Sequence, residues 1–346
     1  MNPNVAAVGR LPEIRLIQYL RGIAAVMVVF YHASGMAPST PDWPAIGQRG
    51  VDVFFVISGF VMTYSTAAGD MTPADFFFKR VMRVVPLYWI VLAYSSRSQW
   101  MSGIATLDIA KDFAFVPRFS SGNAGPIWPA MVPGWTINYE MYFYLLFALC
   151  MFLGRWRLPA IVTLLAASML GNLWPQPGNA PYTFYTHPIA LEFAFGIAIA
   201  YVYLHWPRPR SVPLLSGLLI GAAVALLAGG NVEHAARWLH AGVPATFIVY
   251  AAACLSPLIK SGSTALGVLG DASYSIYLFH QTGFGVATRV LGALGRPLPL
   301  WATVAIFLAF GISLGILMHY ALEKPLLKLT RRGWDQARRH MRLAPR

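Results

Sequence analysis

The stretch LRGIAAVMVVFYHAS, residues 20–34, is apolar enough to lie in a lipid bilayer, yet it contains Arg21 near one end and His32 near the other. An ionisable side chain at membrane depth costs at least about 2.5–3.5 kcal/mol on insertion scales, so such residues face the interior of a helix bundle. At about 100° and 1.5 Å per residue, Arg21 and His32 return to within about 20° of one helix face, about 16 Å apart. The stretch therefore predicts a membrane helix that directs both side chains into one cavity at different depths.

The spacing of this pair leaves two interpretations open. The separation is comparable to an extended pantetheine arm, whose phosphates need a cation at one end and whose thioester needs a base at the other. Alternatively, Arg21 snorkels to the membrane interface and His32 hydrogen-bonds between helices.

The composition indicates a membrane protein with several spans. Of the 346 residues, 57% are hydrophobic and only 11% are charged, whereas a soluble domain carries about a quarter of charged residues. The net charge of +13 does not indicate nucleic acid, because the basic residues lie between apolar runs and in the tail rather than in one stripe interleaved with aromatics. Cys150 and Cys254 both lie inside apolar runs, which predicts buried thiols rather than a disulfide.

Apolar runs of membrane-spanning length, broken by Pro, Gly and charge, predict an all-α bundle of about ten transmembrane helices. The predicted spans are 14–34, 50–69, 79–96, 135–153, 159–174, 188–206, 212–229, 240–258, 269–291 and 299–322. We expect residues 1–346 to form one transmembrane domain with a short basic tail from about residue 325, and no signal peptide.

The distribution of positive charge predicts the orientation of this bundle. With ten spans, most of the 26 lysines and arginines fall on the side that contains both termini. The positive-inside rule then places both termini in the cytoplasm. The longest external connection, residues 97–134, is rich in Gly, Pro and Ser and is expected to shape a mouth for a substrate.

A second cationic motif lies at the cytoplasmic edge of the third predicted span. In FFFKRVMRVVPLYW, residues 76–89, Arg80 and Arg83 stand three residues apart and therefore share one helix face. Paired guanidinium groups suit a phosphate. Anchoring by the positive-inside rule explains the pair equally well.

The fourth predicted span begins with PGWTINYEMYFYLLF, where Glu140 lies about one turn inside the external interface. Because His32 is expected at a similar depth, a His32–Glu140 pair is predicted, in which the carboxylate orients the imidazole and raises its basicity. The alternative is that Trp135 or a tyrosine hydroxyl satisfies Glu140.

Other polar residues near the span ends are weaker candidates. Asp52, at the external start of the second span, is expected close in depth to His32, although it also suits the dipole of its helix N-terminus. His280 in the ninth span is a second basic candidate, and Asp271 with Ser273 is expected to cap that helix.

Several catalytic motifs are absent from the sequence. The chain has no Walker-type loop, H-E-x-x-H, C-x-x-C or H-x4-D motif, which disfavours an ATPase, a zinc protease and a soluble-type glycerolipid acyltransferase. No metal and no tightly bound cofactor is expected.

In their order along the chain, these motifs resemble the membrane acyltransferase-3 family, ten-span enzymes that acylate bacterial glycans, lipids and some antibiotics. The similarity extends from IQYLRGIAAVMVVFYHASG through GVDVFFVISGF, FFFKRVMRVVPLYW, GWTINYEMYFYLLF and LGDASYSIYLFH to HYALEKPLLKL. The resemblance implies a protein of the bacterial inner membrane that transfers an acyl group from cytoplasmic acyl-CoA, expected to be acetyl-CoA, to a hydroxyl group, commonly of a sugar.

The motifs of the family fall on individual residues of this chain. Its Arg-x10-His motif corresponds to Arg21 and His32, its Arg-x-x-Arg motif to Arg80 and Arg83, and its Trp-Ser/Thr-x-x-x-Glu motif to Trp135, Thr136 and Glu140. The Ser-Gly-Phe turn is Ser58, Gly59 and Phe60, His280 matches the histidine of the ninth span, and Glu323 with Pro325 matches the closing Glu-x-Pro. The candidate donor-binding residues are Arg21, Arg80 and Arg83. The candidate catalytic residues are His32, Glu140, Asp52 and His280, and the candidate substrate-binding residues are Trp135, Tyr139 and Ser58.

The chemistry and the partners stay open at several points. His32 acts either as a base during direct transfer or as a nucleophile that forms an acyl-histidine. A proton-coupled transporter, an exporter of a lipid-linked sugar and a purely structural membrane subunit are the alternatives from other classes. The expected partners are acyl-CoA, membrane lipids and a hydroxyl-bearing acceptor such as a glycan, a glycolipid or a macrolide. No extra soluble domain is recognised, which leaves open whether a periplasmic partner protein or a second copy of the chain takes part.

Overall fold

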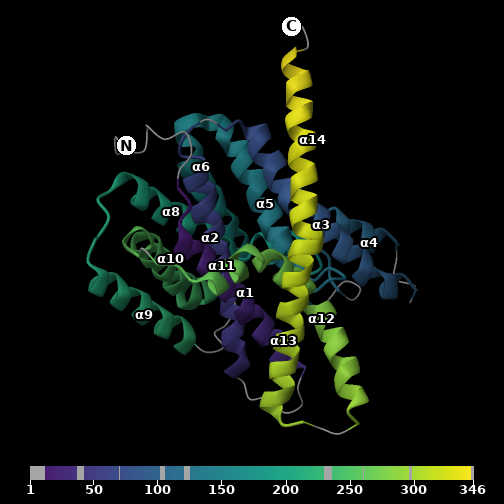
Figure 1. The fold of residues 1–346 in the computed structure, drawn as a ribbon. Coiled ribbons are helices and arrows are strands. Elements are labelled where there is room, and N and C mark those ends of the chain that lie inside the picture. The colour runs from purple at the N-terminus through teal and green to yellow at the C-terminus, as the bar shows by residue number, and fades with distance from the viewer. Residues whose placement is uncertain are drawn as a thin grey trace.

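Helices are the only regular elements in the described part of the chain (Figure 1). The computed structural model describes residues 12–36, 43–69, 71–101, 106–120, 125–229, 236–259, 261–295 and 298–343. Each of the ten predicted segments contains a helix. In chain order these helices are α1 (Arg15–Gly35), α2 (Arg49–Ser65), α3 (Pro73–Met101), α5 (Gly134–Cys150), α6 (Arg157–Ser168), α8 (Leu191–His205), α9 (Val212–Ala228), α10 (Val243–Leu255), α12 (Ser273–Ala293) and α13 (Leu300–Met318). The prediction of an all-α bundle is confirmed for these residues.

Shorter helical elements connect the long ones. The further α-helices are α4 (Thr106–Phe113), α7 (Ala180–Tyr185), α11 (Thr264–Asp271) and α14 (Lys324–Leu343). The 3-10 and π segments are η1 (Trp43–Gln48), η2 (Met151–Trp156), η3 (Met169–Leu173), η4 (Pro188–Ala190), η6 (Trp238–Gly242), η7 (Ser256–Leu258) and η8 (His319–Glu323).

Six helical stretches of the described residues are long and apolar enough to cross a membrane. They are Arg15–Gly35, Ile46–Ser65, Gly134–Leu173, Pro188–His205, Trp238–Leu258 and Leu300–Trp334. The 17-residue helix α9 is apolar but shorter, and neither α3 nor α12 is among the six. The structure therefore supports a helical membrane protein, while the number of ten spans remains a prediction.

The chain reverses inside the longest of these stretches. Gly134–Leu173 has 40 residues, about twice what one bilayer crossing requires. Gly154 interrupts it with φ 54° and ψ −117°, a backbone conformation that a residue with a side chain adopts only with strain. The reversal separates α5 from α6, where the sequence predicts two separate spans.

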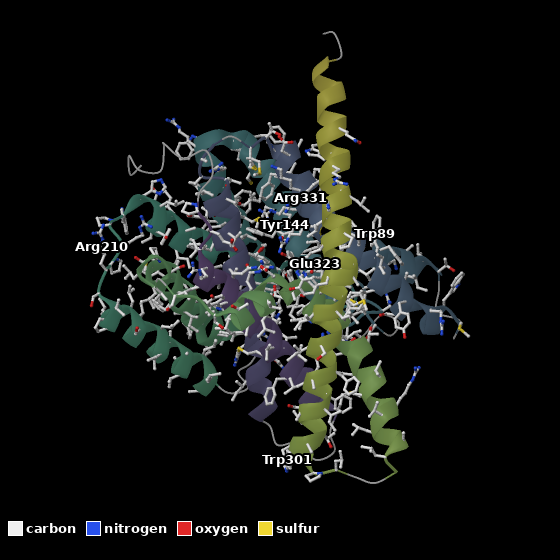
Figure 2. All side chains as sticks on the ribbon, in the orientation of Figure 1. Trp89, Tyr144, Arg210, Trp301, Glu323 and Arg331 are labelled. Atoms are coloured by element: carbon white, nitrogen blue, oxygen red, sulfur yellow. The ribbon has the colours of Figure 1, made fainter. Side chains whose placement is uncertain are left out.

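The last two predicted spans differ in detail from the helices observed. The ninth segment is divided between α11 and α12, which meet at Ala272. The tenth continues through the π turn η8 into α14, so α13 and α14 form one long rod in Figure 1. Figure 2 shows Arg331 on α14 and Trp301 near the opposite end of α13. The basic segment expected as a tail is therefore a helix as far as Leu343.

Two glycines allow α2 and α8 to pack with their backbones in contact. A Cβ on Gly59 would collide with the carbonyl oxygen of Phe193, and a Cβ on Gly196 would collide with the carbonyl oxygen of Val56. Small residues at such crossings are typical of membrane helix pairs. The Ser-Gly-Phe motif lies inside α2 and not in a turn. Its glycine thus has a packing role, and it fixes the position of α2 beside the cavity described below.

We expect Gly59→Ala to destabilise the folded protein by about 1–3 kcal/mol, because the obstructing atom is backbone and both helices must move apart. Thermal unfolding of the purified protein in detergent measures the effect. Gly221→Ala is the matched control, since Gly221 is also inside a helix and has nothing within 4 Å of an added Cβ. A melting temperature for Gly59→Ala equal to that of the control would contradict the packing role.

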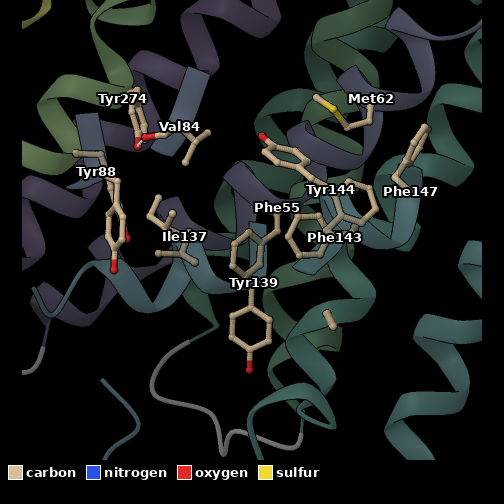
Figure 3. Close-up of a cluster of buried hydrophobic side chains, with 14 of the residues drawn as sticks. Phe55, Met62, Val84, Tyr88, Ile137, Tyr139, Phe143, Tyr144, Phe147 and Tyr274 are labelled. Carbon is tan, nitrogen blue, oxygen red and sulfur yellow. Dashed lines mark hydrogen bonds between the residues drawn. The ribbon is translucent and has the colours of Figure 1, made fainter. Parts of the chain in front are cut away.

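An aromatic core holds α5 against α2, α3 and α8 (Figure 3). The ring of Phe193 stacks on Phe55 at 4.6 Å and on Phe143 at 4.4 Å between centroids. The hydroxyl of Tyr274 on α12 donates to the carbonyl oxygen of Val84 at 2.7 Å. These contacts fix α2, α3, α5, α8 and α12 around the polar residues of α1, α3 and α5.

The described part of the connection from α3 to α5 is held by a buried ion pair. Arg118 donates from Nε and Nη2 to the two carboxylate oxygens of Asp112 at 2.8 Å, and the amide of Ala130 donates to Asp112 at 2.8 Å. Such a bidentate pair fixes geometry more firmly than a single bond. Both free cysteines, Cys150 and Cys254, are buried, as the sequence predicts.

Candidate active site

Three arginines line a cavity of about 150 Å³ between α1, α2, α3, α5 and α12. Arg21 comes from α1, and Arg80 and Arg83 come from one face of α3, as their spacing predicts. All three are half-buried, and Arg21 and Arg80 each experience the charge of Arg83. No side chain in the described residues hydrogen-bonds Arg83, so this arrangement concentrates cations that an anionic ligand can pair.

Glu140 lies among these arginines and not beside His32. It accepts a hydrogen bond from the hydroxyl of Tyr144, one helical turn further along α5, and its charge acts on Arg21 and Arg80. Among the described residues no contact joins Glu140 to His32, so the predicted His32–Glu140 pair is wrong. The alternative of a tyrosine hydroxyl is the arrangement observed.

His32 instead pairs with His280 of α12. Nδ1 of His32 lies 3.2 Å from Nε2 of His280, and the ring centroids are 4.9 Å apart. Nδ1 of His32 also lies 3.0 Å from the carbonyl oxygen of Val28, and Nδ1 of His280 lies 2.7 Å from that of Tyr277. Two histidines from helices far apart in the sequence therefore form one unit.

These contacts assign the protons of the histidine pair. A carbonyl oxygen only accepts hydrogen bonds, so Nδ1 of each ring carries a proton. In neutral His280 the other nitrogen, Nε2, is then an acceptor, and it receives the Nδ1 proton of His32. Nε2 of His32 retains a lone pair and has no hydrogen-bond partner in the described residues. His32 is thus held in the tautomer that a base requires.

The histidine pair lies just beyond one end of the cavity. Tyr277 lines the cavity, and its carbonyl oxygen accepts the bond from His280, one turn further along α12. The hydroxyl of Tyr277 is bonded to Thr136 at 2.7 Å and to the carbonyl oxygen of Pro133 at 3.0 Å. His32 itself does not line the cavity. The prediction that Arg21 and His32 both face one cavity is therefore confirmed only for Arg21.

Several polar atoms that line the cavity have no partner within the described residues. They are the buried hydroxyls of Ser58 and Ser273 and the Nε of Arg80. Buried polar groups are normally hydrogen-bonded, so these atoms are suited to a bound ligand. Ser273 does not cap α12, which has no side-chain cap, and Asp271 accepts a bond from Gln18 instead.

Asp52 lies away from the histidine pair. Its two carboxylate oxygens accept bonds from Arg237 at 2.8 and 2.9 Å, and Glu192 lies beside it, fully buried. One guanidinium therefore engages both oxygens of this carboxylate, and such a bidentate pair fixes its geometry. Its position joins α2, α8 and η6, and no contact in the described residues joins it to His32 or Glu140, so its expected role beside them finds no support in these contacts.

Trp135 and Tyr139 pack in the aromatic core and do not line the cavity. The ring of Tyr139 stacks on Phe184 at 3.8 Å, and its hydroxyl donates to the carbonyl oxygen of Phe184 at 2.6 Å. Trp135 contacts Phe55 and Tyr139 edge-on. Of the three candidate substrate-binding residues, only Ser58 faces the cavity.

A buried polar cluster at η8 was not predicted from the sequence. Glu323 accepts bonds from Ser275 and from Nδ1 of His319, both at 2.7 Å, and its charge acts on Arg21. His319 and Glu323 stand four residues apart in one helix, which is the signal that could have indicated the pair. Among the described residues no group of three or more His, Cys, Asp or Glu side chains could hold a metal ion.

Comparison with known proteins identifies the family. A family model described as an acyltransferase domain, that of acyltransferase-3, matches residues 14–318. The chain belongs to this family. It is a membrane O-acyltransferase, and both the arginine cavity and the histidine pair lie inside the matched region.

Curated relatives agree with this assignment. The exopolysaccharide production protein ExoZ of Rhizobium meliloti (strain 1021) is 35% identical over 88% of this chain and 96% of its own length. The acyltransferase MdmB of Streptomyces mycarofaciens is 25% identical over 83% and 82% of the two chains. The peptidoglycan O-acetyltransferase OatA of Listeria monocytogenes serovar 1/2a (strain ATCC BAA-679 / EGD-e) is 24% identical over 80% of this chain and 50% of its own. No solved structure matches the chain.

Proposed function

We propose that this acyltransferase moves an acyl group, acetyl in the first instance, from cytoplasmic acyl-CoA to a hydroxyl of a cell-surface glycan, glycolipid or related acceptor. The proposal places the protein in the bacterial inner membrane with both termini in the cytoplasm. The proposal rests on one observation. The cavity that three arginines line ends at Tyr277, and the carbonyl oxygen of Tyr277 accepts the hydrogen bond from His280 that orients the histidine pair. The names of ExoZ and OatA, which concern an exopolysaccharide and peptidoglycan, support a glycan acceptor.

The donor is expected to bind through its charge. A thioester donor has phosphates at one end and a neutral, narrow arm at the other. The guanidinium groups of Arg21, Arg80 and Arg83 pair with phosphate oxygens. The unpartnered hydroxyls of Ser58 and Ser273 form hydrogen bonds with the polar groups of the arm. The arm then directs the thioester towards Tyr277.

The transfer step uses His32 as a general base. Nε2 of His32 removes the proton of the acceptor hydroxyl as that oxygen attacks the thioester carbonyl. The C–S bond breaks, the acyl group remains on the acceptor oxygen as an ester, and the proton on His32 passes to the sulfur of the departing CoA. While His32 carries both protons, its Nδ1–H continues to donate to His280 and Val28. His280 acts through His32 and is a positioning residue.

Glu140 is expected to act on donor binding and not on the base. In Glu140→Gln the arginines lose a carboxylate that partly neutralises their charge, while the amide oxygen of glutamine can still accept the bond from the Tyr144 hydroxyl. We expect the KM for acyl-CoA to fall by up to roughly tenfold, because less neutralised arginines attract the donor phosphates more strongly, while kcat changes less. Steady-state kinetics of the purified protein separates the two constants. A large loss of kcat at unchanged KM would contradict this role for Glu140.

The function is tested with the purified protein and with cells. Incubating the protein with radiolabelled acetyl-CoA and an extracted membrane glycolipid or glycan should transfer label to the acceptor and release free CoA thiol in equal amount. Mass spectrometry of surface glycans and lipids from cells with and without the gene should show a difference of one acyl group per modified site. The proposal is wrong if wild-type protein binds acetyl-CoA but no surface molecule differs between the two strains.

A further inference from the structure

A second cavity, of about 440 Å³, lies at the C-terminal end of α2. It shares no lining residue with the arginine cavity. Its polar lining comes from four elements. Thr63 is on α2, Arg155 on η2 and Arg157 at the start of α6, and Tyr201 and His205 are at the end of α8. No step of the mechanism above uses these residues.

The last turn of α2 separates the two cavities. Met62 lines the first cavity and Thr63 the second. Nη2 of Arg80 donates to the hydroxyl of Ser65 at 3.4 Å, and Nη2 of Arg157 donates to the carbonyl oxygen of Thr66 at 3.1 Å. Guanidinium groups from both cavities therefore meet at one helical turn. A molecule with two separate phosphate groups can place one of them at each guanidinium group.

The second cavity combines cationic, aromatic and hydroxyl groups. Arg155 is exposed, stacks its guanidinium on Trp156 at 5.5 Å, and has no acidic partner in the part of the chain that the structure describes. The rings of Tyr201 and His205 stack at 4.2 Å with an interplanar angle of 25°. Thr63 is 1% exposed, and its buried hydroxyl has no partner in the described residues. Phosphate, a flat heterocycle and a polar sugar match these three groups.

We propose that the second cavity binds the adenosine 3′-phosphate end of the acyl-CoA donor. This rests on the proposed function. The arginine cavity, at about 150 Å³, is well below the roughly 300–1,000 Å³ of sites for drug-sized ligands, so it accommodates the arm but not the nucleotide. The 3′-phosphate pairs with Arg155 and Arg157, the adenine lies on the Tyr201–His205 rings, and the diphosphate passes the last turn of α2 towards Arg80.

The test compares CoA with dephospho-CoA, which lacks only the 3′-phosphate. Dissociation constants are measured for both compounds by calorimetry on the purified full chain in zwitterionic detergent. Wild type is expected to prefer CoA by roughly tenfold, the worth of one charge-assisted phosphate contact. Arg155→Gln and Arg157→Gln should lose this preference and keep the wild-type affinity for dephospho-CoA. Because Arg157 also bonds α2, Arg155→Gln keeps the test valid if Arg157→Gln does not fold.

Arg210→Gln is the matched control. Arg210 is exposed in the link between α8 and α9 and lies at the edge of the bundle in Figure 2. It should retain the full preference for CoA. If Arg155→Gln and Arg157→Gln also retain it, or if wild type does not distinguish the two compounds, the assignment is overturned. Failure of the proposed function itself looks different, because wild type would then neither bind CoA nor transfer acyl groups.

An anionic phospholipid headgroup has the same phosphate chemistry. Repeating the measurements in nanodiscs of phosphatidylcholine alone and with phosphatidylglycerol separates the two sources. The preference for CoA and its loss in Arg155→Gln should be the same in both membranes. If Arg155→Gln prefers CoA over dephospho-CoA as wild type does, and differs from wild type only in the amount of phosphatidylglycerol that it retains, the cavity is a lipid site and the inference is wrong.

Discussion

His32→Ala is expected to lower the single-turnover rate of acyl transfer by about 10²–10⁴-fold, the usual contribution of a general base. The reason is that Nε2 of His32 is the nitrogen of the pair that has a lone pair and no partner in the described residues. Acyl-CoA binding should stay close to wild type, because His32 does not line the arginine cavity. Rapid-quench measurement with labelled acetyl-CoA and saturating acceptor gives the rate. Wild-type rates in the variant would eliminate His32 as the base.

Variants of His280 separate positioning from chemistry. His280→Ala leaves Nδ1 of His32 with only the Val28 carbonyl as acceptor, so the ring is free to reorient and the rate should fall, but by less than in His32→Ala. His280→Gln offers a side-chain oxygen in place of Nε2 and should recover part of the rate. Equal losses of rate in His280→Ala and His280→Gln would indicate that His280 does not act through His32.

The same experiment distinguishes direct transfer from an acyl-histidine. Acid quenching of wild type without acceptor should leave no label on the protein if transfer is direct. Label that is present in wild type and absent in His32→Ala would identify His32 as a nucleophile instead. The arrangement with His280 is compatible with either route, because both require a lone pair on Nε2.

Helix periodicity was sufficient to predict that Arg80 and Arg83 share one helix face. Arg80 and Arg83 are three residues apart on one helix, and Arg21 enters the membrane from the same expected side, so depth and face together bring them into one cavity. Gly59 shows the limit of this reasoning. Its motif was recognised, but its role as a contact between α2 and α8 depends on how two distant helices cross.

The errors came from pairing residues by depth alone. Glu140 and His32 were placed at one depth, but depth does not specify which neighbouring helix a side chain meets. Glu140 finds Tyr144 within its own helix. His32 meets His280, 248 positions away in the sequence. Tyr139 precedes Glu140 by one residue and therefore points about 100° away, into the aromatic core.

Replacing Arg80 and Arg83 together with glutamine is expected to weaken acyl-CoA binding by about 100-fold or more, since each lost charge-assisted contact is worth about 1.5–3 kcal/mol and each 1.4 kcal/mol is a factor of ten. Both side chains line the cavity, and the Nε of Arg80 is buried without a partner in the described residues. At saturating donor the turnover should fall much less, because the thioester meets the unchanged histidine pair. Calorimetry with CoA and steady-state kinetics measure the two effects.

Lys79→Gln is the control for this double variant. Lys79 precedes Arg80 on the same helix, but it is exposed and does not line the cavity. If the arginines serve only as positive-inside anchors, removing them should alter membrane insertion and expression and leave the affinity of the folded protein for CoA unchanged. Lys79→Gln should then have a similar but smaller effect on insertion and expression. If they bind the donor, the folded double variant loses affinity while Lys79→Gln retains it. The ratio of the CoA affinities of the two variants therefore decides whether Arg80 and Arg83 anchor the helix in the membrane or bind the donor, since the sequence of the motif fits both roles.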